Sequence, residues 1–205
     1  MTETAAWIPL QVHSQYSILD ASASPKSIAR TASKWGIPAV ALTDNGNMFG
    51  VVEFYKACKG EGIKPILGCE MYLAPESRHD KKRIPGKRNG YRLVLLAKND
   101  TGYHNLCKLS SLGYLEGFYY NPRIDWELLT QHAEGLLCIT GYVGTRLGDA
   151  LLEEAPEAAR ALLDEHRQLF GDDLYLAVQN HAMTEEELHV HGMHEESWLL
   201  QRYQD

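Results

Sequence analysis

The sequence predicts an α/β protein with a parallel sheet covered by helices. Short apolar segments alternate with helical patterns along most of the chain, and the connections between them are short. Three apolar segments also end close to a metal-binding type of side chain, at His13, Asp44 and Glu70. With 205 residues the chain is long enough for one sizeable core, so we expect a single domain over residues 1–205.

The first half of the chain predicts strand, helix, strand, helix and strand in that order. An apolar strand begins at Trp7 and ends at His13, and a polar turn after it carries Asp20. Ser24 followed by Pro25 is typical of a helix start, and this helix is expected to end at Gly36. The next expected elements are a strand over 39–43, a helix over 51–59 and a strand over 65–73.

The second half continues the alternation after a basic loop over residues 76–90. Leu106, Leu109 and Leu112 are spaced for the inner face of a helix over 103–115. Asp125 is typical of the residue that caps a helix, here a short one ending at His132. The remaining expected elements are strands over 92–97, 136–140 and 174–178, a helix from 156 to 170, and a final helix after a capping box at 184–187.

Composition indicates a soluble globular protein. Apolar residues make up 44% and charged residues 23% of the chain, and no apolar run approaches the roughly 20 residues that span a bilayer. The first residues lack the basic and apolar regions of a signal peptide, so we expect a cytoplasmic location without membrane contact. The four cysteines are widely spaced and are expected to be buried free thiols.

The net charge of -7 is unevenly divided, since the segment from Asp149 onward is acidic and the preceding one is basic. Much of the basic excess lies in the loop over 76–90, which Gly86 and Gly90 predict to be a mobile tip. Lys81, Lys82 and Arg83 are candidates for phosphate contact, because clustered cations gain affinity by releasing counterions. A solvated charged loop is an equally simple interpretation.

His13, Asp20, Asp44 and Glu70 form a candidate metal site. Imidazole nitrogen and carboxylate oxygen bind divalent metals, and strand ends that meet at one edge would bring these side chains together. No phosphate-binding glycine loop and no serine or cysteine nucleophile with a readable histidine partner accompanies them.

Several ordered segments resemble one family. They include Val12-His13-Ser14-Gln15-Tyr16-Ser17, Ala41-Leu42-Thr43-Asp44, the run from Gly46 to Lys56, the run from Gly62 to Glu70, Pro122-Arg123-Ile124-Asp125 and Gln179-Asn180-His181. Together they resemble the polymerase and histidinol phosphatase (PHP) domain at the N-terminus of bacterial replicative DNA polymerase III alpha subunits. The resemblance covers nearly the whole chain.

The resemblance implies a distorted seven-stranded β/α barrel. About six strands can be counted from the sequence, and the family's further strand with an Asn-Asp-x-His element should follow the last helix. The sequence stops at Asp205 without that element, so we expect a barrel truncated before its last strand, or part of a longer polymerase chain.

The resemblance also implies a cluster of up to three metals with about nine ligands, of which this chain keeps only some. His13, Asp44, Glu70 and His181 occupy matching positions, and Asp20 lies in the turn beside them. The other ligand positions differ: the family's histidines are replaced by Gln11, Asn45 and Arg92, and its cysteine by Tyr142. We therefore regard Gln11, His13, Asp20, Asp44, Asn45, Glu70, Arg92, Tyr142 and His181 as vestigial metal-site positions without a catalytic residue.

Arg92 is the most consequential of these differences. A guanidinium remains protonated in proteins and places a fixed positive charge where a cation would bind. Paired with Glu70 or Asp20, it would neutralise carboxylates that otherwise repel one another. We therefore expect no resident cofactor in this chain.

Three hypotheses on function follow. The first is a largely non-catalytic PHP scaffold that supports the rest of a polymerase alpha chain, docks a proofreading exonuclease and meets DNA only through the larger assembly. DNA synthesis would then use magnesium in a separate polymerase core. The second is a metal-dependent phosphoesterase or 3'-5' nuclease, with zinc or manganese on His13, Asp20, Glu70 and His181. The third is direct DNA contact through the basic loop.

Overall fold

The computed structural model describes residues 7–153 and 155–179. Its helices are α1 (Pro25–Lys34), α2 (Val51–Gly60), α3 (Asp100–Leu115), α4 (Trp126–Gln131), α5 (Arg146–Leu152), α6 (Pro156–Phe170) and the 3-10 helix η1 (Gly171–Asp173). Its strands are β1 (Ala39–Leu42), β2 (Lys64–Leu73), β3 (Tyr91–Ala97), β4 (Arg123–Ile124), β5 (Leu136–Thr140) and β6 (Leu174–Leu176). The fold is α/β, as the alternating pattern predicts.

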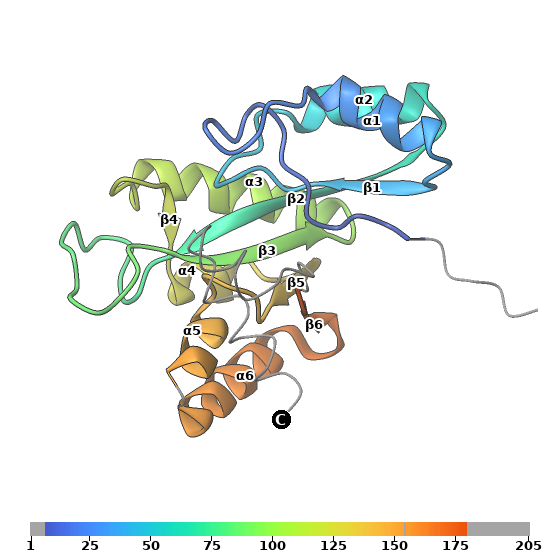
Figure 1. The fold of residues 1–205 in the computed structure, drawn as a ribbon. Helices are drawn as coiled ribbons and strands as arrows, with labels where there is room; N and C mark the ends of the chain where they lie inside the picture. The colour runs from blue at the N-terminus through green and yellow to red at the C-terminus, as the bar shows by residue number, and fades with distance from the viewer. Residues whose placement is uncertain (1–6, 154, 180–205) are drawn as a thin grey trace, which may run out of the picture.

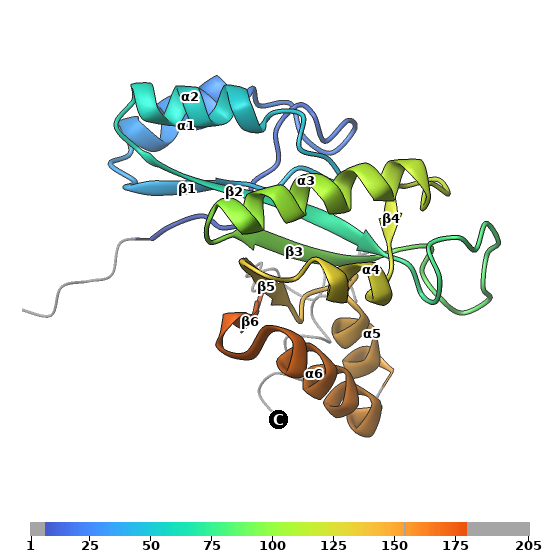
Figure 2. The same cartoon turned by 180° about the vertical axis from the view of Figure 1, so that it is seen from behind.

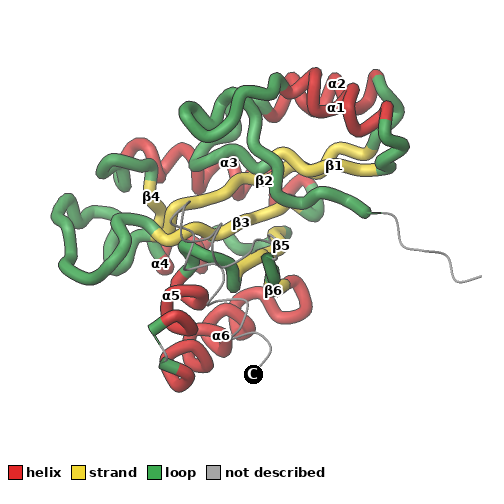
Figure 3. The backbone as a smooth tube through the Cα atoms, viewed as in Figure 1, coloured by secondary structure: helices red, strands yellow, loops and turns green. Residues whose placement is uncertain are grey.

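One mixed sheet organises these elements in the order β1-β2-β3-β5-β6, with β4 paired to β2 (Figure 1). β1 is parallel to β2 and β6 is parallel to β5, whereas β3 is antiparallel to both β2 and β5. The long loop between β2 and β3 contains no helix (Figure 3). The expectation of a purely parallel sheet is therefore wrong at β3, because a connection without a crossover helix returns the chain in the opposite direction.

The prediction of a first strand from Trp7 to His13 is also wrong, since residues 7–14 form no regular strand. The segment still runs beside β1, where the amide of Ala41 donates to the carbonyl of Pro9 at 3.0 Å and that of Thr43 to Val12 at 2.8 Å. Pro9 has no amide hydrogen, which prevents a continuous ladder of backbone bonds here. The segment nevertheless places His13 beside the sheet.

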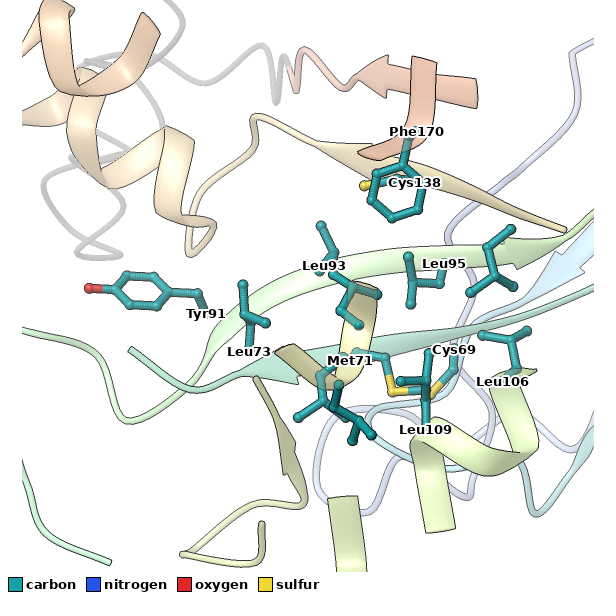
Figure 4. Close-up of a cluster of buried hydrophobic side chains, with 14 residues drawn as sticks. Cys69, Met71, Leu73, Tyr91, Leu93, Leu95, Leu106, Leu109, Cys138 and Phe170 are labelled. Atoms are coloured by element: carbon teal, nitrogen blue, oxygen red, sulfur yellow. The ribbon is translucent and has the colours of Figure 1, made fainter. Parts of the chain in front are cut away.

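The main core lies between one face of β2 and β3 and the helices that cover it (Figure 4). Alternate residues of β2, namely Cys69, Met71 and Leu73, point into this core because successive strand residues face opposite sides. Leu106 and Leu109 of α3 pack against them, as predicted from their spacing. Figure 2 shows α3 lying along β2 and β3.

Capping signals in the sequence are confirmed where the structure describes them. The Ser24 side chain accepts from the amide of Ser27 at the start of α1, and Asp125 accepts from the amide of Leu128 at the start of α4. Helix α5 was missed, because its seven residues give too short a pattern to read. The helix expected after 184–187 lies outside the described residues.

Candidate functional site

Strand alternation places Glu70 on the face of β2 opposite the main core. Its neighbours Cys69 and Met71 point toward α3, so the Glu70 side chain points away from them. Tyr72 pairs with Arg92 and Glu70 pairs with Val94 across β2 and β3. Arg92 is therefore a diagonal neighbour of Glu70 on the same face of the sheet.

Four hydrogen-bond donors and cations surround the buried Glu70 carboxylate. Gln11 Nε2 donates to Oε2 at 2.9 Å, and His13 Nε2 lies 2.7 Å from the same oxygen. On the other oxygen, the Tyr142 hydroxyl donates to Oε1 at 3.2 Å, and Arg92 Nη1 lies 3.6 Å away. We call these five residues the Glu70 network. Arg92 thus lies beside Glu70, where its charge is opposite to the carboxylate.

The Glu70 network keeps the carboxylate ionised. Burial by itself raises the pKa of Glu70, but hydrogen bonds from His13 and Gln11 and the positive charges of His13 and Arg92 outweigh it and lower the pKa below its ordinary value. Because an ionised carboxylate only accepts, His13 Nε2 must carry the donated hydrogen. Burial and the nearby negative charge of Glu70 raise the pKa of Tyr142 well above its ordinary value, so its hydroxyl remains a donor.

This arrangement limits what Glu70 can do chemically. A carboxylate has about four lone-pair sites, and four groups already approach its two oxygens. A metal would have to displace at least one of them. Within residues 7–153 and 155–179, no group of three or more His, Cys, Asp or Glu side chains is placed to hold a metal ion.

The carboxylates of the other acidic positions bind different partners from Glu70. Asp44 is buried and binds the 14–17 turn: its Oδ1 accepts from the Ser14 amide at 2.6 Å and the Ser17 hydroxyl at 2.7 Å. Asp20 instead accepts from Asn45 Nδ2 at 2.6 Å. Asn45 Oδ1 is buried without a partner among the described residues. His181 lies outside the described residues.

Most cations of the basic loop over 76–90 are bound by nearby acids or carbonyls. Arg78 donates to Asp125 at 2.9 Å and to Glu116 at 2.7 Å, and Arg88 donates to Asp149 at 2.8 Å. Lys81, one of the candidate phosphate contacts, donates to the carbonyl of Glu116. The exposed side chains of Lys82 and Arg83 have no hydrogen-bond or ion-pair partner among the described residues.

Arg123 is a positioning residue that sequence reasoning missed. It is 1% exposed and its guanidinium donates to the carbonyls of Asp80 at 2.7 Å, Gly117 at 3.1 Å and Asn89 at 3.3 Å. These bonds fasten the basic loop to the chain that follows α3. In the sequence, Arg123 is marked only by its position between Pro122 and the helix-capping Asp125. That position does not predict which carbonyls the Arg123 side chain contacts.

Comparisons with known proteins identify the family. The profile of the PHP domain matches residues 9–181. The chain belongs to the PHP domain family. It is 51% identical over 197 residues to DNA polymerase III subunit alpha of Chlamydia pneumoniae, an alignment that covers 96% of this chain and 16% of that protein. It is 44% identical over 180 residues to the same subunit of Thermus aquaticus, covering 86% of this chain and 15% of that protein.

This PHP domain is thus homologous to one part of those alpha subunits and spans about 16% of the length of the relative from Chlamydia pneumoniae. Among solved structures, an amidohydrolase from Chromobacterium violaceum matches with a TM-score of 0.44 and 15% identity, covering 88% of this chain and 89% of that one. A putative metal-dependent phosphoesterase from Bifidobacterium adolescentis matches with a TM-score of 0.39 and 18% identity, covering 53% of this chain and 33% of that one. No helix in the described part of the chain is long and apolar enough to cross a membrane.

Proposed function

We propose that this chain is a largely non-catalytic scaffold within a DNA polymerase III alpha subunit and that it docks a proofreading exonuclease. Homology to the alpha subunits supports the polymerase context. The Glu70 network supports the non-catalytic part of the proposal, because donors and a fixed cation surround the buried Glu70 carboxylate. Such a site stabilises an anion and does not present lone pairs to a metal.

A metal-dependent phosphoesterase is the alternative. Zinc or manganese would be held by His13, Asp20, Glu70 and His181 and would activate water for attack on a phosphate ester. This alternative needs Arg92 to point away from Glu70, whereas its Nη1 lies 3.6 Å from the carboxylate. It also needs His13 to release the nitrogen that now donates to Glu70.

Metal content separates the two proposals. Protein purified without chelator is expected to contain far less than one equivalent of zinc or manganese, in both the wild type and the Glu70→Ala variant. Near-stoichiometric metal that is lost in Glu70→Ala would contradict the scaffold proposal. It would then justify a search for phosphodiester hydrolysis.

An exposed aromatic surface supports the docking role. Tyr16, Phe49, Tyr114 and Phe118, which we call the aromatic face, form a chain of ring contacts with centroids 6.4, 5.9 and 6.2 Å apart. Phe49 is 65% exposed and Phe118 is 52% exposed, although burial of such rings is strongly favourable. Clustered exposed rings are typical of protein interfaces, where aromatic anchors supply much of the affinity.

Docking through the aromatic face is testable by substitution. The Phe49→Ser/Phe118→Ser variant is expected to bind a proofreading exonuclease subunit at least about tenfold more weakly, because each interface anchor contributes roughly 1–2 kcal/mol or more. Trp35→Ser is the control, since Trp35 is 67% exposed and is not part of this chain of rings. Calorimetric titration that finds equal affinities for the wild type and both variants would place docking elsewhere.

A further inference from the structure

The outer surface of α1 and α2 contains a polar groove that is separate from the Glu70 network. The inner faces of the two helices pack together through Ala29, Ala32, Phe54 and Cys58. Their outer faces enclose a groove of about 640 Å³. Its lining consists of Lys26, Arg30, Val52, Glu53, Lys56, Ala57, Gly60 and Glu61.

Positive charge is concentrated on these two helices. Together α1 and α2 carry five Lys or Arg residues and one acidic residue, Glu53, and the groove lining adds a second acidic residue, Glu61, directly after α2. Lys26, Arg30 and Lys56 are exposed and form no ion pair or hydrogen bond through their side chains within the described residues. They differ in this from Arg78 and Arg88, whose charges are neutralised by acids of the same chain.

The spacing of these cations suits a linear polyanion. Lys26 and Arg30 are four residues apart on α1, so they lie on one side of the helix and about 6 Å apart along its axis. Lys56 approaches the same groove from α2. Acidic α6 and η1 lie at the other end of the molecule (Figure 1), so the acidic side chains that a polyanion would meet at the groove are Glu53 and Glu61 of its own lining.

We propose that the α1–α2 groove contacts the phosphate backbone of duplex DNA without reading its sequence. Lysine and arginine bind phosphates as charge partners and release counterions, which requires no shape-specific pocket. The apolar lining residues are Val52 and Ala57, so the groove lacks the large aromatic anchor on which a peptide interface usually centres. It also lacks a ring on which an unpaired base would stack, which favours duplex over single-stranded DNA.

A salt series on the purified chain tests this proposal. Binding of a fluorescein-labelled 30-base-pair duplex is measured by anisotropy, for the wild type and for the groove variant Lys26→Gln/Arg30→Gln/Lys56→Gln. Losing three phosphate contacts is expected to reduce the slope of log affinity against log salt by about 2.7. The matched control, Lys108→Gln/Arg160→Gln/Arg167→Gln, removes the same charge from exposed positions elsewhere and is expected to keep the wild-type slope.

Glu53→Gln provides a variant that gains function. Glu53 lines the groove and opposes an anion there, so its neutralisation is expected to tighten duplex binding several-fold at low salt. Such a gain does not result from misfolding, and thermal unfolding of each variant verifies the fold. The proposal does not depend on exonuclease docking, because the groove residues are distinct from the aromatic face and the two binding assays are separate.

Four results would overturn the proposal. The first is that the wild-type chain does not bind duplex DNA at 50 mM salt. The second is an equal loss of salt slope in the groove and control variants, and the third is a loss of slope in the control variant alone. The fourth is that the wild-type chain binds polyglutamate as tightly as DNA. The second result would indicate a general effect of net charge. The third would assign DNA contact to the control positions instead, and the fourth would favour an acidic protein partner.

Discussion

Replacing Glu70 by glutamine is the most direct test of the Glu70 network. Glutamine has nearly the same shape, but it retains one acceptor oxygen and presents an amide group at the other position. Two donors approach each carboxylate oxygen, so the new amide must face either Gln11 and His13 or Tyr142 and Arg92. With the hydrogen bonds arranged as in the structure, either orientation places donors opposite a donor inside the protein.

The magnitude follows from the hydrogen bonds that are lost. A hydrogen bond to a charged group contributes about 1.5–3 kcal/mol, and the burial of Glu70 prevents water from replacing it. The 42% exposure of the Arg92 side chain reduces the contribution of that ion pair. We therefore expect Glu70→Gln to lower the free energy of unfolding by about 2–4 kcal/mol and the melting temperature by roughly 4–16 °C for a chain of this size.

The assay is urea unfolding followed by circular dichroism, with calorimetry for the melting temperature. Glu134→Gln serves as the control, because Glu134 is exposed and its carboxylate has no ion-pair partner in residues 7–153 and 155–179. We expect the control to remain within about 0.5 kcal/mol of the wild type. Equal stability of Glu70→Gln and the control would refute the view that the network holds an ionised carboxylate.

Three further predictions concern pH, the basic loop and the thiols. Because the folded-state pKa of Glu70 lies below its ordinary value of 4.5, the stabilisation that ionised Glu70 provides is present above about pH 4.5 and is lost as pH falls through the folded-state pKa. Lowering the pH should therefore reduce the free energy of unfolding more in the wild type than in Glu70→Gln. Parallel curves of unfolding free energy against pH for the two proteins would contradict this. Arg123→Met should leave several loop carbonyls without their donor and accelerate tryptic cleavage after Lys82, while an unchanged cleavage rate would show that the loop is held by other contacts. Cys107 should be the first thiol that a thiol-reactive label modifies in the native protein, since Cys58, Cys69 and Cys138 are buried and burial raises the pKa of Cys58 to about 11. Equally rapid labelling of Cys58 would contradict this expectation.

Local signals in the sequence predicted local structure well. A helix cap depends on residues three positions apart, so Ser24 and Asp125 could be assigned from the sequence and are confirmed. Helical spacing likewise placed Leu106 and Leu109 in the core. These predictions succeed because the interactions involve neighbours along the chain.

Long-range partners were beyond the sequence pattern. The antiparallel direction of β3 depends on the path of the loop before it, and the sequence of that loop does not predict its path. Arg78 and Arg88 contribute to the basic excess of the loop, but acids 38 or more residues away in the sequence neutralise them. Among the described residues, exposed cations without a partner therefore include Lys82 and Arg83 of the basic loop, the region that the sequence emphasised, and also Lys26, Arg30 and Lys56 of α1 and α2.

The Glu70 network also explains how several differences from the family pattern act together. At three positions where the resemblance implies metal ligands, this chain has Gln11, Arg92 and Tyr142, and each directs a donor or a positive charge at Glu70. A metal site surrounds a cation with lone pairs, whereas this site surrounds an anion with hydrogens. Reverting Arg92 alone to histidine would leave the donors of Gln11 and Tyr142 on the carboxylate. Under the scaffold proposal, the site is therefore expected to bind metal only after several positions change together.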